Sequence, residues 1–160
     1  MIADASRVQA LAGTKEVYAT TLNIPHPYSD GLAEQWIASH AVQFYAGKGA
    51  TFAITLAEGG DLVGAIGLGV QPQHQRGELG YWVGVPYWNQ GYCTEAAIAV
   101  IRYGLHELGL HKITSRHMVG NHASERVMVK AGMRKEGELL DEIYKDGAFR
   151  TLGVYGLVKA

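Results

Sequence analysis

The chain has 160 residues, which suits one domain, and 48% of them are hydrophobic, which is enough to form a core. A formal net charge of −1 and only 14 scattered Lys and Arg residues argue against binding to nucleic acid or to an anionic membrane. Cys93 is the single cysteine, so no internal disulfide can form. No apolar stretch approaches the roughly 20 residues that span a bilayer, and we expect a soluble, cytoplasmic protein.

The first half of the chain predicts two helices, at residues 3–12 and 32–45. Apolar residues at helical spacing in the second helix, including Trp36 and Phe44, are expected to face the core. Three strands should follow, with a tight turn at 58–61 between the first two. Their expected ranges are 51–57, 62–70 and 78–85.

The second half alternates between helices and strands before it ends in a hairpin. A long helix is predicted at 94–108, and Asn121 is expected to cap a shorter one that ends near residue 131. The remaining strands are expected at 112–119, 134–144 and 149–158. This order of elements predicts an α/β or α+β fold with a mixed sheet, because βα units do not alternate throughout.

The segment from Trp88 to Ala96 is the most informative for function, because a strand ends there and a glycine-containing loop leads directly into a helix. The first amides of a helix lack partners and carry the positive end of its dipole, so they suit phosphate groups. Gly91 would let an anion approach the backbone closely. The alternative is an ordinary strand–loop–helix connection. Neither common nucleotide-binding glycine motif is present.

This loop resembles the acetyl-CoA loop of GNAT acetyltransferases in their RimJ/RimL-like branch. Four further segments match that branch in order and spacing: Gly80-Tyr81-Trp82-Val83, Asn121-His-Ala-Ser124, Lys130-Ala-Gly132-Met133 and Glu136-Gly137. The resemblance implies one GNAT domain over residues 1–160, whose fourth and fifth strands splay apart. The family's first strand has no match, because the sequence begins at the helix that follows it; either that strand is absent or the natural start lies upstream. Asn89, Cys93 and Met133 replace residues that are usual in the branch.

By the same resemblance, acetyl-CoA would bind between the splayed strands and the glycine loop. The residues expected to contact it are Trp82, Val83, Val85, Gln90, Gly91, Tyr92, Cys93, Thr94, Asn121 and Ser124. A strand amide near Val83 would stabilise the oxyanion. The seven histidines show no paired spacing and have no companion cysteines, so we expect no metal.

The catalytic residues are less clear from the sequence. Glu78 is the first candidate for a general base, although a surface carboxylate is an equal alternative. Many GNAT enzymes reprotonate the leaving thiolate with a tyrosine, and Met128 stands at the matching position here. Ser124 is the substitute candidate, and its alternative role is hydrogen bonding in the first turn of a helix. The residues expected near the acceptor, or else simply on the surface, are His26, Tyr28 and His74.

The leading hypothesis is acetyl transfer to a primary amine, on either a protein N-terminus or a small molecule. The chain has no long acidic run of the kind that would point to a polycationic acceptor. The alternative is a non-catalytic acyl-CoA sensor or assembly module, because a fold alone does not fix function. An exposed strand edge or the C-terminal hairpin could support a homodimer.

Overall fold

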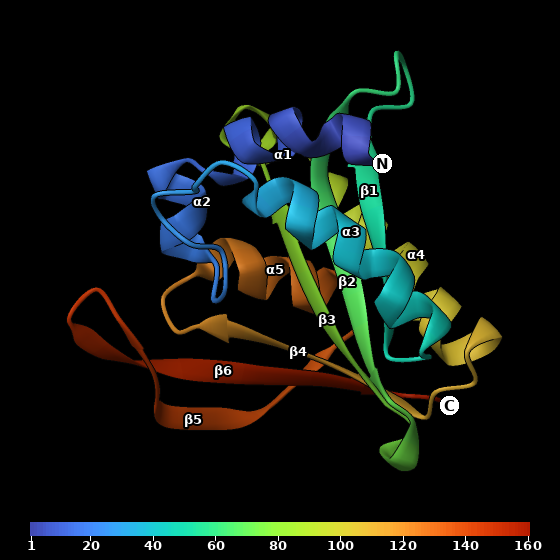
Figure 1. The fold of residues 1–160 in the computed structure, drawn as a ribbon. Coiled ribbons are helices and arrows are strands. Elements are labelled where there is room, and N and C mark those ends of the chain that lie inside the picture. Colours follow the sequence, from blue (N-terminus) through green and yellow to red (C-terminus); the bar gives the residue numbers. More distant parts are fainter.

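A computed structural model describes residues 1–160, whose strands form one six-stranded sheet with helices on both faces (Figure 1). The strand order is β1-β2-β3-β4-β6-β5. Only β3 and β4 are parallel, so the sheet is mixed, as predicted. The strands are β1 (Gly49–Thr55), β2 (Leu62–Gln71), β3 (Arg76–Val83), β4 (Lys112–Met118), β5 (Arg134–Lys145) and β6 (Ala148–Val158).

The first three α-helices cover one face of the sheet, and the last two cover the other (Figure 1). The helices are α1 (Ala5–Ala12), α2 (Lys15–Thr20), α3 (Leu32–Tyr45), α4 (Tyr92–Arg102) and α5 (His122–Lys130). Short turns of other helix types are η1 (Ile2–Asp4), η2 (Pro72–His74), η3 (Val85–Tyr87) and η4 (Tyr103–Glu107). None of these helices has the length and hydrophobicity that crossing a bilayer requires.

The helices differ from the prediction at two places. The sequence did not reveal α2, which has only six residues and begins after Thr14, whose side chain accepts a hydrogen bond from the Val17 amide. The helix predicted at 94–108 is α4 followed by η4, which is a single π-helical turn. At Gly104 in that turn, a Cβ would lie 2.9 Å from the side chains of Ile113 and Leu68. Glycine therefore lets η4 pack closely against the sheet.

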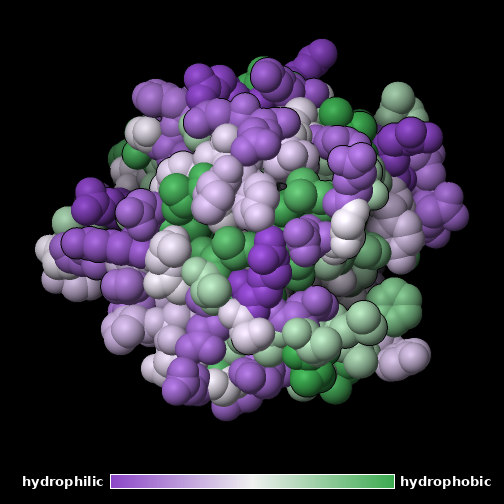
Figure 2. Space-filling model, turned by 90° about the horizontal axis from the view of Figure 1, so that it is seen from above, coloured by the Kyte–Doolittle hydropathy of each residue, from purple (hydrophilic) through white to green (hydrophobic).

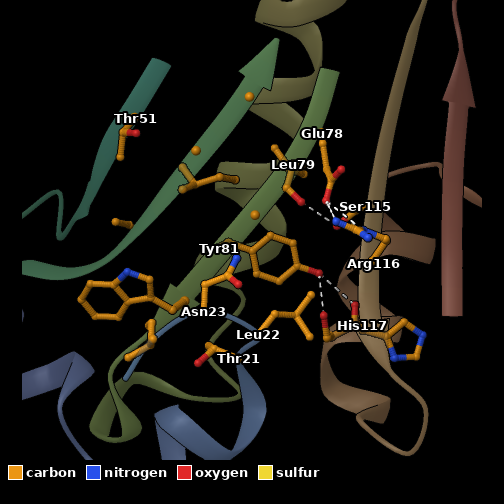
Figure 3. A pocket seen from close by; sticks show the side chains of 18 of the residues that line it. Thr21, Leu22, Asn23, Thr51, Glu78, Leu79, Tyr81, Ser115, Arg116 and His117 are labelled. Atoms are coloured by element: carbon orange, nitrogen blue, oxygen red, sulfur yellow. Dashed lines mark hydrogen bonds and ion pairs between the residues drawn. The ribbon is translucent and has the colours of Figure 1, made fainter. Parts of the chain in front are cut away.

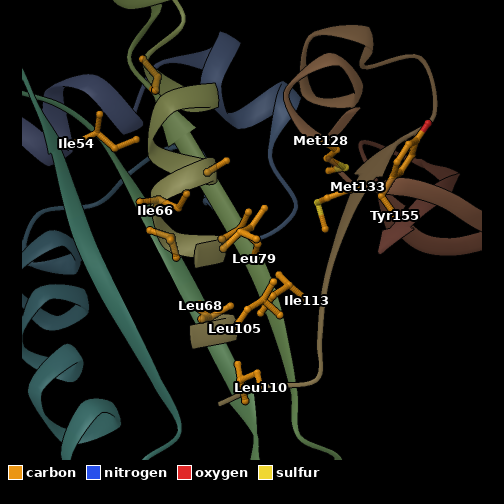
Figure 4. Close-up of a cluster of buried hydrophobic side chains, with 14 of the residues drawn as sticks. Ile54, Ile66, Leu68, Leu79, Leu105, Leu110, Ile113, Met128, Met133 and Tyr155 are labelled. Carbon is orange, nitrogen blue, oxygen red and sulfur yellow. The ribbon is translucent and has the colours of Figure 1, made fainter. Parts of the chain in front are cut away.

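The main core lies between the sheet and α4, with contributions from α5 (Figure 4). Ile66 and Leu68 on β2 and Ile113 on β4 are fully buried there, because alternate residues on a strand point to the same face. A smaller cluster of Ala and Val side chains joins α1 and α3 to the opposite face. Trp36 packs beside this second cluster, whereas the prediction that Phe44 faces the core was wrong, because its side chain is 54% exposed.

The parallel strands β3 and β4 separate along their length, as the resemblance predicted. Arg76 to Leu79 pair with Lys112 to Ser115, and no pairing between the two strands continues beyond them. The Ser115 hydroxyl donates to the Leu79 carbonyl at 2.9 Å, at the last pair before the strands part. The two strands are the third and fourth here, because no strand precedes α1 in residues 1–160.

The surface seen from the α1 side is mostly hydrophilic, with hydrophobic side chains in small groups (Figure 2). On the opposite side of the molecule, β5 is an edge strand whose residues are almost all exposed.

Candidate functional site

Two cavities meet where β3 and β4 separate. The first, of about 570 Å³, lies on the face of the sheet between β1 and β4, next to the segment from Thr20 to Ile24; we call it the sheet cavity. The second, of about 470 Å³, lies between the loop that precedes α4 and the helix α5; we call it the loop cavity. The residues that line both are Thr20, Thr21, Tyr81, Trp82 and Ser124. Groups bound in the two cavities would therefore meet at these side chains.

The N-terminus of α4 opens into the loop cavity. Gly91 is the residue before the helix, with φ +88°, and no side chain caps the first turn. The first helical amides are therefore free to bind an anion. Asn89 has φ +60°, and asparagine tolerates this left-handed conformation better than most residues do. This explains how asparagine can replace the glycine that is usual in the branch.

Two basic residues line the loop cavity from α5. Arg126 and Lys130 are four residues apart, so they lie on the same side of the helix. Neither forms an ion pair, and no Asp or Glu lines the cavity. The cavity therefore carries free positive charge beside a helix N-terminus, which suits a ligand with several phosphates. Neither residue was predicted from the sequence, although their spacing on a predicted helix was a usable signal.

Most of the residues predicted to contact acetyl-CoA line the loop cavity. They are Trp82, Val83, Gly91, Tyr92, Cys93, Thr94, Asn121 and Ser124. Val85 and Gln90 do not line it: Val85 begins η3, and the Gln90 amide donates to the Pro86 carbonyl at 3.0 Å.

The walls of the loop cavity are fixed by hydrogen bonds. Asn121 caps α5 by accepting from the Ser124 amide at 3.2 Å, and its own amide donates to the Thr20 carbonyl at 3.1 Å. The Trp88 indole donates to the Val83 carbonyl at 2.6 Å. Burial raises the pKa of the Cys93 thiol to about 12, so the thiol stays protonated at neutral pH. This favours the interpretation of Cys93 as a loop residue rather than a nucleophile.

Tyr81 and Ser124 form a hydroxyl pair across the gap between β3 and α5. The two hydroxyl oxygens are 2.9 Å apart, and the Tyr81 hydroxyl also lies 3.1 Å from the Ser124 carbonyl oxygen. Burial raises the pKa of Tyr81 far above its usual value, so this hydroxyl keeps its proton across the physiological range. Tyr81 belongs to a motif that the sequence showed, but it was not predicted as a site residue.

Glu78 lies in the sheet cavity, on the stretch of β3 that is still paired with β4 (Figure 3). Arg116 on β4 donates two hydrogen bonds to its Oε1 atom, at 2.9 and 2.7 Å. The other carboxylate oxygen, Oε2, has no hydrogen-bond partner in the protein. Glu142 lies 3.9 Å from the same guanidinium but does not line the cavity.

The three residues predicted near the acceptor are not brought into either cavity. His26 donates from Nδ1 to the Gly13 carbonyl, Tyr28 packs against the second core cluster, and His74 belongs to η2. Trp36 and Lys48 line the sheet cavity instead. No group of three or more His, Cys, Asp or Glu side chains is arranged to hold a metal ion.

Comparison with known proteins identifies this arrangement. Residues 1–134 match the family model of the acetyltransferase (GNAT) domain. The uncharacterized N-acetyltransferase YoaA of Bacillus subtilis is 32% identical over 124 residues, which cover 77% of this chain and 70% of YoaA. The alanine N-acetyltransferase of ribosomal protein uS5 from Escherichia coli is 33% identical over 72 residues, which cover 45% of this chain and 37% of that enzyme.

Among solved structures, RimL, a ribosomal L7/L12 α-N-protein acetyltransferase in complex with coenzyme A, superposes with a TM-score of 0.90. The match covers 99% of this chain and 90% of RimL. Because the sequences are only 14% identical, it shows that the two proteins share a fold and nothing further.

The chain belongs to the GNAT acetyltransferase family. It is an enzyme that transfers an acetyl group from acetyl-CoA to an amine. The RimJ/RimL-like resemblance of the sequence is confirmed, and the alternative of a non-catalytic sensor is not favoured.

Proposed function

We propose that the loop cavity binds acetyl-CoA and that the sheet cavity receives the acceptor amine. The observation that carries this proposal is the contact between the two cavities at the Tyr81–Ser124 pair. The first amides of α4 would hold the pyrophosphate, and Arg126 and Lys130 would neutralise its charge and that of a further phosphate. The one continuous sheet supports treating residues 1–160 as a single domain.

The protein's own groups would then promote direct attack of the amine on the thioester. The Gly84 amide donates to the Val63 carbonyl on β2. Because successive amides of a strand point in opposite directions, the Val83 amide points into the gap between β3 and β4, where it would stabilise the oxyanion. Oε2 of Glu78 would accept the proton of the amine through water, and Arg116 would hold that carboxylate in place.

The Tyr81–Ser124 pair would return a proton to the leaving thiolate. The Ser124 hydroxyl lies at the junction of the cavities and would give its proton to the thiolate while it takes a proton from Tyr81. Burial raises the pKa of Tyr81, which keeps the proton on its hydroxyl until the thiolate leaves, and water that enters after CoA dissociates would return a proton to Tyr81. The pair would replace the tyrosine whose position Met128 occupies in this chain.

The acceptor is a primary amine on a protein N-terminus or on a small molecule. Relatives that act on ribosomal proteins favour a protein acceptor. A homodimer and a cytoplasmic location stay predictions.

The test combines acetyl-CoA with a panel of amines and measures the release of CoA thiol. Tyr81→Phe and Ser124→Ala should each lower kcat by about 100-fold, the lower limit for a general acid, while the Kd for acetyl-CoA changes little. Tyr155→Phe is the matched control, because the Tyr155 hydroxyl also reaches α5, where it donates to Glu125 at 2.6 Å, but it lines neither cavity.

Two results would count against the proposal. If Tyr155→Phe loses as much activity as Tyr81→Phe, the hydroxyl of Tyr81 has only a structural role. If acetyl-CoA raises the Tm of the wild type but no amine causes release of CoA thiol, the alternative of a non-catalytic sensor gains support.

A further inference from the structure

Three glycines lie side by side in the sheet cavity. Gly67 and Gly69 belong to β2, and Gly80 belongs to β3. Gly67 is directly opposite Gly80, and Gly69 is opposite Glu78. Because residues two apart on a strand, and residues directly opposite across strands, share one face, all three point the same way. We call Gly67, Gly69 and Gly80 the glycine floor.

Local structure does not require glycine at these three positions. None of them has a positive φ, so each lies in extended backbone that other residues adopt. A Cβ at Gly80 would have no heavy atom within 4 Å, and one at Gly69 would have only the Glu78 carbonyl oxygen, at 3.9 Å. At Gly67 the nearest atom, the Thr51 hydroxyl oxygen, would be 3.5 Å away, which is ordinary contact.

Other glycines in the same strands differ in this respect. A Cβ at Gly64 would collide with the Trp82 carbonyl, and one at Gly77 would lie 2.7 Å from the Leu68 side chain. Packing explains those glycines, but it does not explain the floor. Glycine also destabilises a strand relative to alanine. The floor glycines therefore provide open space above the sheet at some loss of stability.

Aromatic side chains border the open space. Trp36 on α3 and Trp82 on β3 both line the sheet cavity. The Trp36 ring is held by an edge contact with His40, at 4.4 Å between ring centroids. A side-chain-free surface beside tryptophan rings suits a flat or branched apolar group, because such a group can bury its whole width there.

The charges of the sheet cavity exclude a polycation. The Glu78 carboxylate is already paired with Arg116, and the Lys48 ammonium has no ion-pair partner. No other Asp or Glu lines the cavity. A second positive charge on the acceptor would therefore find no partner.

We propose that the glycine floor is the acceptor-specificity subsite, which takes an amine with a broad, uncharged body such as an aromatic ring. The amine would point toward the Tyr81–Ser124 junction, and its body would lie across the floor beside Trp36. This inference rests on the proposed function, because it assumes that the sheet cavity receives the acceptor.

The test compares phenylalaninamide, which has a broad body, with glycinamide, which has none. The wild type should prefer phenylalaninamide in kcat/KM. Gly67→Ala and Gly80→Ala should each lower kcat/KM for phenylalaninamide by about 10-fold or more, because one methyl group in a pocket changes discrimination by roughly 10–200-fold. The kcat/KM for glycinamide should change less than about threefold, since the added methyl group does not contact this smaller amine. The Kd for acetyl-CoA should not change, and Tm should not fall.

Gly137→Ala is the matched control, because Gly137 lies in β5, has open space around it and lines neither cavity. It should preserve both kcat/KM values. The inference is overturned if the floor variants change kcat/KM for both amines equally or for neither, or if Gly137→Ala has the same effect. It is also overturned if the wild type binds acetyl-CoA but prefers glycinamide or acetylates neither amine. A wild type whose Tm does not respond to acetyl-CoA would instead refute the proposed function, and this inference with it.

Discussion

The loop cavity and the sheet cavity share five lining residues but are built in different ways. The loop cavity takes most of its lining from residues 81–94 and α5, so neighbouring residues in the sequence cooperate in binding. The sheet cavity collects side chains from the α2–α3 connection, α3 and four strands. A contiguous stretch whose backbone binds phosphate leaves a recognisable sequence signal, whereas an acceptor site assembled from distant segments does not.

The two cavities also differ in charge and in contents. The loop cavity has two unpaired basic residues and no acidic one, which suits an anionic ligand with several phosphates. The sheet cavity contains a neutralised ion pair and a glycine floor, whose open space can be altered by single methyl groups. We therefore expect substitutions in one cavity to leave binding in the other intact.

The largest expected effect comes from Gly91→Asp, which places a carboxylate at the N-terminus of α4. Aspartate tolerates the left-handed backbone of Gly91, so the fold should survive. Bringing like charges together costs several kcal/mol, and the affinity for acetyl-CoA should therefore fall by more than about 100-fold in calorimetric titration.

Two controls separate charge from backbone strain in this experiment. Gly91→Asn has similar size without the charge and should bind much better than Gly91→Asp. Gly59→Asp puts the same residue at φ +79° in the β1–β2 turn, outside both cavities, and should bind normally. If Gly91→Asn binds as weakly as Gly91→Asp, the phosphate assignment loses its support.

Glu78→Gln should lower kcat about 100-fold at neutral pH, because it removes the proposed general base. The loss should shrink as the pH rises, since an amine that is already neutral needs no base. Glu142→Gln is the control, because Glu142 also approaches Arg116 but lies outside the sheet cavity. An equal loss in both variants, or a loss that does not depend on pH, would show that Glu78 only positions Arg116.

Arg126→Ala and Lys130→Ala should have the smallest effects, of about tenfold each on the Kd for acetyl-CoA. Hydrogen bonds to charged groups contribute about 1.5–3 kcal/mol, and exposed groups such as these lie at the lower end of that range. The affinity of the wild type should fall with added salt, and that of the variants should fall less. Lys159→Ala, at an exposed position far from the cavity, should leave the Kd unchanged.

The sequence predicted the mixed sheet, the helix α3 and most of the loop cavity, because periodicity and local motifs act over short distances. It missed α2, because six residues are too few to show a hydrophobic period. It also missed the Tyr81–Ser124 contact, which joins residues 43 positions apart. The ion pair of Glu78 with Arg116 was missed for the same reason, since strand register decides which distant side chains meet.

The structure places none of the residues predicted near the acceptor in either cavity, also because distant segments form these cavities. His26 and His74 were chosen because they lie in loops, but the connections that form the sheet cavity are the Thr20–Ile24 segment and the strand faces. A glycine within a strand often marks a bulge or a close approach of the backbone. Gly64 and Gly77 fit this rule, because a Cβ at either position would collide with its neighbours, whereas the glycine floor does not.

A crystal structure of the protein with acetyl-CoA would test the assignment of the two cavities most directly. We expect the pyrophosphate at the first amides of α4, beside Arg126, and the thioester at the hydroxyls of Tyr81 and Ser124, with the glycine floor left open. Acetyl-CoA lying across the glycine floor, or a thioester far from both hydroxyls, would contradict the assignment of the two cavities.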